Sequence, residues 1–199
     1  MRVVTLLAAI AVLASACGGT AAAPTPSPAR PATAAPAART TAPIAAASCA
    51  VKQITFVKAP SKAVITLEKG GTITIALRPD KAPNTVTNFA NVAMSGCYDG
   101  LMFHRVVPNF VIQGGDPLGN GTGGGTQPAE YNDLPFVKGA VGIARGQDKA
   151  INNRFQFYIC IGECRSLDGQ YTNFGLVTDG QTVADGVRVG DTIKTITVE

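Results

Sequence analysis

The sequence contains no tryptophan and only one histidine, His104, among its 199 residues. Charged residues make up 15% of the chain, and its formal net charge of +4 arises without any run of lysine or arginine. Binding of nucleic acid therefore has little electrostatic support. Because His104 is the only imidazole, any Ser-His-Asp or Cys-His catalytic site would have to use it, and a zinc site built from several histidines is excluded.

Long hydrophobic runs are also lacking, except at the N-terminus. Val3 to Leu13 is apolar apart from Thr5, which is too short a stretch to span a membrane. Met1-Arg2 precedes this stretch and the small residues Ala14 to Ala16 follow it. This layout predicts a secretory signal peptide over residues 1–16, in preference to a buried N-terminal helix.

Cys17 follows directly, and Leu13-Ala14-Ser15-Ala16-Cys17 resembles a bacterial lipobox, in which the cysteine is acylated. The chain is then expected to be exported and lipid-anchored to the outer face of the bacterial cytoplasmic membrane. The alternative is ordinary cleavage after Ala16, which would leave a secreted protein with a free thiol.

Residues 17–48 are mainly alanine, proline and threonine, with no acidic residue and no aromatic residue. Such a segment buries too little apolar surface to offset the entropy of ordering, so a disordered linker is predicted. The remaining residues, 49–199, are enough for one domain with its own core.

Four cysteines fall in this domain, namely Cys49, Cys97, Cys160 and Cys164. Export permits disulfide bonds, but the sequence leaves three full pairings open. A zinc site is the weaker reading because no CxxC motif is present. No metal or other cofactor is expected.

Alternation of apolar and polar residues predicts a mainly β domain. Strands are expected over residues 63–67 and 72–77, joined by the turn Gly70-Gly71, and then over 101–107, 110–113, 137–144, 155–161, 174–177 and 192–198. Helices are expected over 83–95 and, more weakly, 181–187. The glycine-rich segment 114–125 lacks a following GK[ST] and is read as a loop rather than a nucleotide site. The pattern is typical of an antiparallel barrel or sandwich.

Acid, base and nucleophilic chemistry finds little support along this domain. No GxSxG motif occurs, and the acids Asp116, Glu130 and Asp133 have no spacing that indicates a carboxylate pair. What stands out is Arg105 in an apolar strand, with Gln113 eight residues later.

These two residues belong to FHRVVPNFVIQGGD, residues 103–116, which resembles the central signature of the cyclophilins. GNGTGGG, QFYI (156–159) and LDGQYTNFGLV (167–177) resemble later family segments, and ITIALRPDKAPNTVTNFANVA resembles an earlier one. The motifs agree in order from Ala63 to Glu199.

The resemblance implies a closed eight-stranded antiparallel β-barrel capped by two α-helices. It also implies a peptidyl-prolyl cis-trans isomerase that needs no cofactor and acts on proline-containing polypeptides. Together with the predicted export, this leads us to expect an enzyme that assists the folding of exported proteins. Arg105 falls on the catalytic position. The substrate-binding positions fall on Phe110, Val111, Gln113, Ala144, Arg145, Tyr158, Leu167 and Tyr171, with Arg145 expected to contact the peptide mainly through its backbone.

The chain departs from the family pattern at a few of these positions. Tyr158 replaces a phenylalanine, Tyr171 replaces a histidine, and Ser166 replaces a bulky aromatic residue that helps to bind cyclosporin. Binding of cyclosporin-type inhibitors is therefore not expected. We expect a monomer that meets the membrane only through its lipid. The alternatives are a proline-peptide-binding or chaperone module with little turnover, and a structural envelope lipoprotein.

Overall fold

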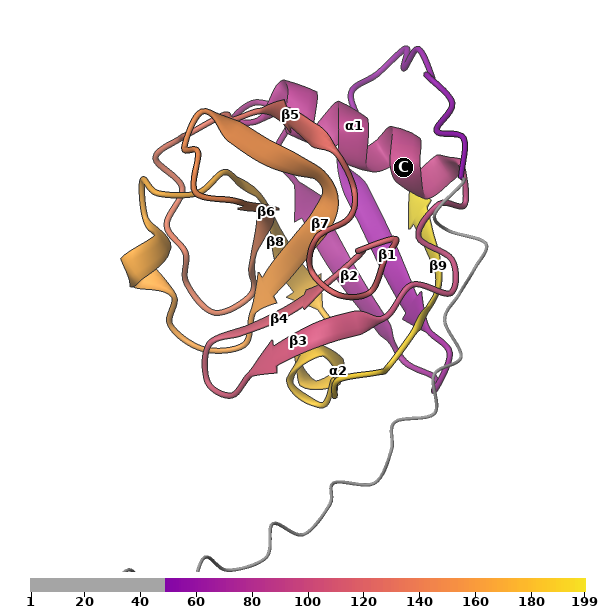
Figure 1. The fold of residues 1–199 in the computed structure, drawn as a ribbon, viewed down its shortest axis with the longest axis vertical. Helices are drawn as coiled ribbons and strands as arrows, with labels where there is room; N and C mark the ends of the chain where they lie inside the picture. The colour runs from indigo at the N-terminus through magenta and orange to yellow at the C-terminus, as the bar shows by residue number, and fades with distance from the viewer. Residues whose placement is uncertain (1–48) are drawn as a thin grey trace, which may run out of the picture. The chain divides into compact units, whose positions relative to one another are not determined.

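The computed structural model describes residues 49–199 (Figure 1). The predicted signal peptide, Cys17 and the predicted linker lie outside these residues. The described elements are, in chain order, β1 (Lys62–Leu67), β2 (Thr72–Leu77), α1 (Pro83–Met94), β3 (Phe103–Val107), β4 (Val111–Gly114), β5 (Thr126–Pro128), β6 (Ala140–Arg145), β7 (Ile151–Cys160), the 3-10 turn η2 (Arg165–Leu167), β8 (Asn173–Asp179), α2 (Gln181–Asp185) and β9 (Ile193–Val198).

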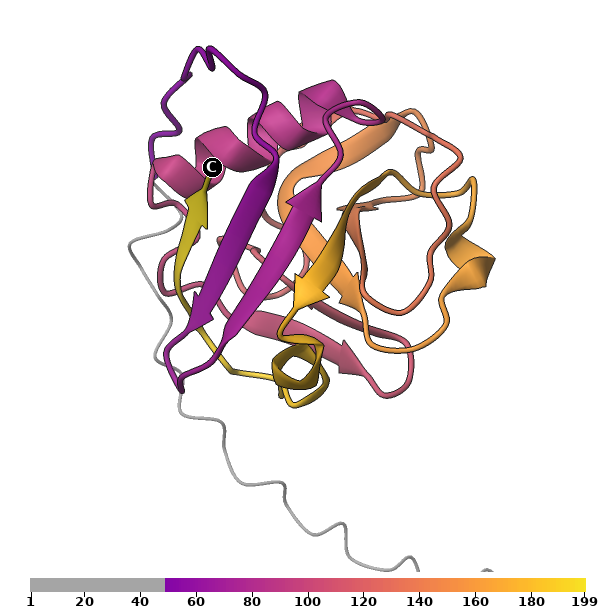
Figure 2. The same cartoon turned by 180° about the vertical axis from the view of Figure 1, so that it is seen from behind.

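All strands belong to one antiparallel sheet, which curls around its core. The strands follow the order β3-β4-β7-β6-β8-β2-β1-β9, and β5 pairs with the first part of β7. Helix α1 crosses one end of the curled sheet and α2 lies at the other end, as both views show (Figures 1 and 2). The expected mainly β architecture with two helices is confirmed.

The predicted closed eight-stranded barrel is wrong. The two end strands, β3 and β9, share no ladder, and the segments before them meet at a single bridge between Met102 and Thr192. Backbone hydrogen bonds flank this bridge, among them Gly100 N to Ile193 O at 2.8 Å and Phe103 N to Asp191 O at 2.8 Å. From the bridge, β3 and β9 run in opposite directions. The start of β3 bonds to the turn before β9, and the start of β9 bonds to the turn before β3, so the two strands form no ladder and the sheet stays open.

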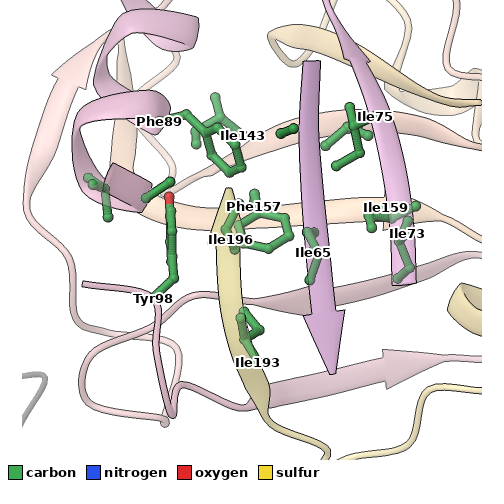
Figure 3. Close-up of a cluster of buried hydrophobic side chains, with 14 of the residues drawn as sticks. Ile65, Ile73, Ile75, Phe89, Tyr98, Ile143, Phe157, Ile159, Ile193 and Ile196 are labelled. Carbon is green, nitrogen blue, oxygen red and sulfur yellow. The ribbon is translucent and has the colours of Figure 1, made fainter. Parts of the chain in front are cut away.

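The main core fills the inside of the curl. Strands β1 and β2 bury every second side chain, which is the period-2 pattern of a strand with one covered face. Helix α1 contributes Val86 and Phe89, three positions apart on its buried face. Figure 3 shows Phe89 beside Phe157 of β7 among the isoleucines of the sheet, and the two rings meet edge to face at 5.6 Å.

A second, smaller cluster of buried residues lies where β4, β6 and β7 meet η2. It comprises Val111, Phe136, Ala140, Ala144, Tyr158, Cys160 and Cys164, with Val107, Phe110, Leu167 and Tyr171 packed against it. Several of these residues are predicted substrate-binding residues, so the packing of this cluster holds them in place.

The structure selects one cysteine pairing of those left open. Cys49 and Cys97 form a disulfide with 5.6 Å between their Cα atoms, whereas Cys160 and Cys164 are buried free thiols. Among residues 49–199, no group of three or more potential metal ligands occurs, and no helix is long and apolar enough to cross a membrane.

Candidate active site

One cleft of about 130 Å³ brings together all nine of the predicted site residues. Arg105 of β3 and Gln113 of β4 form its polar wall, whereas the floor consists of Phe110, Val111, Ala144 and Tyr158. Arg145 at the end of β6, Leu167 of η2 and Tyr171, which precedes β8, form the far wall. The residues that line the cleft are Arg105, Phe110, Val111, Gln113, Ala144, Arg145, Tyr158, Leu167 and Tyr171.

The floor of the cleft is apolar and rigidly packed. The ring of Tyr158 stacks on Phe136, with centroids 5.8 Å apart, and meets Tyr171 edge to face at 5.9 Å. Val111 and Ala144 are buried beside it. Such a floor can hold a small aliphatic ring by excluding water from it.

Arg105 stands at the polar wall because of the strand register. β3 and β4 form a tight hairpin in which Arg105 pairs with Gln113 across the strands. Asn109, at the turn, has the left-handed backbone angle φ 58°, which asparagine tolerates better than most residues. The pairing places the Arg105 guanidinium and the Gln113 amide on the same face of the sheet.

Three side chains form a hydrogen-bonded series along this wall. Arg105 Nη1 donates to Gln113 Oε1 at 3.3 Å, and Gln113 Nε2 donates to Gln156 Oε1 at 3.0 Å. Gln156 Nε2 in turn donates to the carbonyl of Gly123 at 2.8 Å. Gln156 was not predicted as a site residue, although it opens the QFYI motif; only its contact with Gln113 reveals its role in orienting that amide.

The glycine-rich loop presents the Gly123 carbonyl because buried Asp116 organises the loop. The Asp116 carboxylate accepts backbone N–H groups from Leu118 at 3.0 Å and Asn120 at 2.9 Å. A Cβ at position 123 would lie 2.2 Å from Asp116 Oδ1, so only glycine fits there. The loop thus serves as a support for the wall.

Arg145 lies at the opposite wall, with its side chain fixed. Nε donates to the carbonyl of Gln170 at 2.9 Å, and Nη1 donates to the carbonyl of Gly146 at 2.8 Å. The guanidinium carbon lies 4.4 Å from the ring centroid of Tyr171, in cation–π geometry. The family resemblance implied mainly a backbone role for Arg145, and the structure adds this ordered cation to the cleft.

The hydroxyl of Tyr158 occupies space that a glycine leaves open. Gly142 pairs with Tyr158 across β6 and β7, and a Cβ at position 142 would lie 2.3 Å from Tyr158 Oη. That hydroxyl is buried and has no hydrogen-bond partner among the described residues. Burial raises the pKa of Tyr158 far above its ordinary value, so the phenol stays neutral.

The groups that could perform acid or base catalysis lie elsewhere. His104 is not among the lining residues, and burial lowers the pKa of its imidazole. Glu130 accepts the backbone N–H of Thr85 at 2.7 Å at the start of α1, and Asp133 pairs with Lys81 at 2.7 Å. No carboxylate lines the cleft, so its chemistry is that of two cations, two amides nearby and an apolar floor.

Most of the described residues match one family model. Residues 63–198 match the model described as cyclophilin type peptidyl-prolyl cis-trans isomerase/CLD. A protein of Synechococcus elongatus named peptidyl-prolyl cis-trans isomerase is 39% identical over 142 residues, covering 69% of this chain and 96% of that protein. Peptidyl-prolyl cis-trans isomerase B of Bacillus subtilis is 41% identical over 135 residues, covering 67% and 94%.

Solved structures agree with this match. A Cryptosporidium parvum cyclophilin-type isomerase superposes with a TM-score of 0.65 at 26% identity, covering 70% of this chain and 98% of that one. A structure of the same protein determined in the presence of the dipeptide Ala-Pro gives a TM-score of 0.64, also at 26% identity, covering 69% and 98%.

Proposed function

The chain belongs to the cyclophilin-type peptidyl-prolyl cis-trans isomerases, and from this premise we propose that it catalyses X-Pro rotation in exported proteins, with Arg105 as the catalytic residue. The observation that carries the proposal is the series Arg105–Gln113–Gln156 beside an apolar floor. The related structure determined in the presence of the dipeptide Ala-Pro supports proline-containing peptides as the ligand class.

The reaction needs orientation of the peptide more than covalent chemistry. Amide resonance sets a barrier of about 18–20 kcal/mol, and unaided X-Pro exchange takes tens to hundreds of seconds. The floor formed by Phe110, Val111 and Tyr158 holds the proline ring. The guanidinium of Arg105 then donates to the substrate and favours the twisted state, in which the proline nitrogen is no longer conjugated and accepts a hydrogen bond.

The size of the required effect is modest. To raise the exchange rate from about 0.01 to about 10 per second, the enzyme must lower the activation free energy by roughly 4 kcal/mol. One charge-assisted hydrogen bond contributes about 1.5–3 kcal/mol. The remainder comes from holding the ring and excluding water at the cleft floor. Gln113 acts as a positioning residue, since its amide fixes the guanidinium while Gln156 fixes the amide.

The test measures X-Pro exchange in a short Ala-Pro peptide by exchange NMR. The mature chain should accelerate exchange, and Arg105→Ala should reduce kcat/KM by about a hundredfold or more. Arg105→Lys should recover little of the loss because an ammonium lacks the planar fork. Arg188→Gln removes a cation that lines a different pocket and serves as the matched control.

A folded wild-type chain that binds the peptide without accelerating exchange would overturn the enzymatic proposal. It would favour the alternative of a proline-peptide-binding or chaperone module. Full activity in Arg105→Ala would instead remove Arg105 from the catalytic role.

We also propose that the protein is lipid-anchored through Cys17 on the outer face of the cytoplasmic membrane. The leader pattern of residues 1–16 and the disulfide between Cys49 and Cys97 support export. Mass spectrometry of the native N-terminal peptide should find a diacylated or triacylated cysteine. An unmodified N-terminus at position 17, or release of the wild-type protein into the medium, would contradict the anchor and leave the secreted alternative.

A further inference from the structure

The cleft carries two cations that form no ion pair within the described residues. Arg105 and Arg145 both line it, and the six ion pairs among residues 49–199 include neither. Lys149 adds a third charge nearby, because its Nζ donates to the side chain of Gln170, whose carbonyl also holds Arg145. Lys149 likewise takes no part in these ion pairs.

The acidic groups around the cleft are engaged elsewhere. The Asp148 carboxylate accepts the backbone N–H of Ala150 at 2.8 Å, and Asp168 pairs with Arg165 at 2.6 Å and accepts the backbone N–H of Phe136 at 2.7 Å. Both lie outside the cleft lining. The lining of the cleft is therefore positively charged, which favours a negatively charged ligand.

Arg145 is also prepared to bind an anion. Its Nε and one Nη1 proton are used by the carbonyls of Gln170 and Gly146, and the Tyr171 ring supports its plane. A guanidinium has five N–H donors, so donors remain for a ligand. Because the side chain is already ordered, binding a carboxylate costs little further conformational entropy.

We propose that the cleft selects proline peptides with a carboxylate side chain next to the proline, and that Arg145 is the residue that determines this preference. The inference rests on the proposed isomerase function and names the substrate class of the same site. Arg105 engages the reacting peptide unit, whereas Arg145, on the opposite wall, engages the neighbouring side chain. Lys149 strengthens the field without being required for the contact.

The chain itself contains a contrasting sequence. Residues 20–48 hold six prolines and no acidic residue, and Arg30 directly precedes one of the prolines. The preference for a carboxylate would make these X-Pro bonds poor ligands of the chain's own cleft. The site would then stay free for other polypeptides, although a proline-rich segment precedes it on the same chain.

The experiment uses the mature chain and matched peptides of the form Ala-Xaa-Pro-Yaa. Xaa and Yaa are varied in turn through Ala, Gln, Glu and Lys, and kcat/KM is measured by exchange NMR. At low ionic strength we expect Glu to exceed Gln by about fivefold at one flanking position or both, with Lys below Gln. At 0.5 M NaCl the ratio should fall below about twofold, since screening shortens the range of the field.

Variants assign the preference to its residue. Arg145→Gln should bring the Glu-to-Gln ratio close to one, and Arg145→Lys should restore part of it. Arg188→Gln makes the same change of charge away from the cleft and should leave the ratio unchanged. A ratio near one in the wild type, or an unchanged ratio in Arg145→Gln, would overturn the proposal.

A binding measurement keeps this test separate from catalysis. Dissociation constants for the Glu and Gln peptides come from NMR titration of the Tyr171 resonances. If the Ala-Pro peptide is not isomerised at all, the proposed function fails, yet tighter binding of Glu peptides that depends on Arg145 would still support the charge preference. Equal binding of both peptides would contradict it.

Discussion

Within residues 49–199, the buried hydroxyl of Tyr158 lacks a hydrogen bond that would compensate for its removal from water. It lies over Gly142 and has no partner among the described residues, and an unsatisfied buried hydroxyl costs about 1–3 kcal/mol. Tyr158→Phe should therefore keep the aromatic floor and leave the free energy of unfolding unchanged or raised by roughly 1 kcal/mol. Urea unfolding measures the stability, and peptide exchange should show unchanged kcat/KM within about twofold.

Tyr171→Phe is the control for that substitution, because Tyr171 is only half-buried. It should change stability little. A loss of more than about 1 kcal/mol in Tyr158→Phe would mean that the hydroxyl has a partner, such as a bound water.

His104 makes stability depend on pH in a window that few other groups reach. Burial lowers the pKa of its imidazole below the ordinary 6.5, the Arg105 charge lowers it further and the Asp116 carboxylate raises it. The folded state thus prefers the neutral ring. This contribution is complete above pH 6.5 and is lost as the pH falls through the lower folded pKa.

Wild-type stability should therefore decline as the pH falls below about 6.5. His104→Gln should show a flatter profile over the same window, measured by urea unfolding at stepped pH. Since His104 is the only histidine in the chain, no other imidazole can mask the difference. Parallel profiles for the two proteins would contradict the assignment.

At the residue scale, the sequence identified every residue that lines the cleft, because the family motifs carry them in order. The orientation of these side chains could not be predicted from the sequence. The Arg145 side chain is set by the Gln170 carbonyl, 25 positions away in the chain. The support of Gln113 by Gln156 likewise depends on two strands lying side by side, which no local pattern encodes.

Helix α1 obtains its N-terminal cap from a distant residue. Ala82 stands at the N-cap position and makes no side-chain capping bond. Glu130 instead accepts the backbone N–H groups of Asn84 at 3.0 Å and Thr85 at 2.7 Å. Its negative charge also complements the positive end of the helix dipole.

Glu130→Ala should lower the free energy of unfolding by about 1–2 kcal/mol, since it removes a cap and leaves donors unpaired. Glu130→Gln should lose less. Glu163→Ala, an exposed acid of the same type, serves as the control. Thermal and urea unfolding test this, and equal stability of all three variants would contradict the capping role.

At the element scale, the helices and strands with a strong hydrophobic periodicity were predicted correctly, whereas a strand with no such periodicity was missed. The alternating strands β1, β2 and β9 and the helix from Pro83 follow their predicted ranges within one residue. The three-residue strand β5, which directly follows the glycine-rich segment, was missed because it exists only by pairing with β7. The open edge was missed for a related reason, since turns at both end strands interrupt the ladder.

The disulfide links the first described residue, Cys49, to Cys97, which lies three residues after the end of α1. Cys49 precedes all the strands, so the bond restricts a loop of 48 residues in the unfolded chain. Cys49→Ser should lower the free energy of unfolding by about 3–4 kcal/mol. Cys160→Ser is the control for loss of a thiol alone. Equal stability of the reduced and oxidised wild type would contradict this estimate.

At the scale of the whole molecule, the sequence predicted one domain but left the pairing of its cysteines open. Cys49 and Cys97 lie far apart in the chain, whereas Cys160 and Cys164 lie close together yet remain free. Proximity in sequence says little about pairing, because the fold decides which side chains meet.

The position of that disulfide also determines how the domain would bear a mechanical load. If the chain is pulled from its N-terminal end, tension passes at Cys49 through the cross-link to Cys97 and bypasses the loop that contains β1, β2 and α1. Single-molecule extension of the oxidised protein should lack roughly 170 Å that the reduced protein releases. The covalent path of the force would then exclude β1, β2 and α1, whereas the strands after Cys97, which carry the cleft, would lie on it.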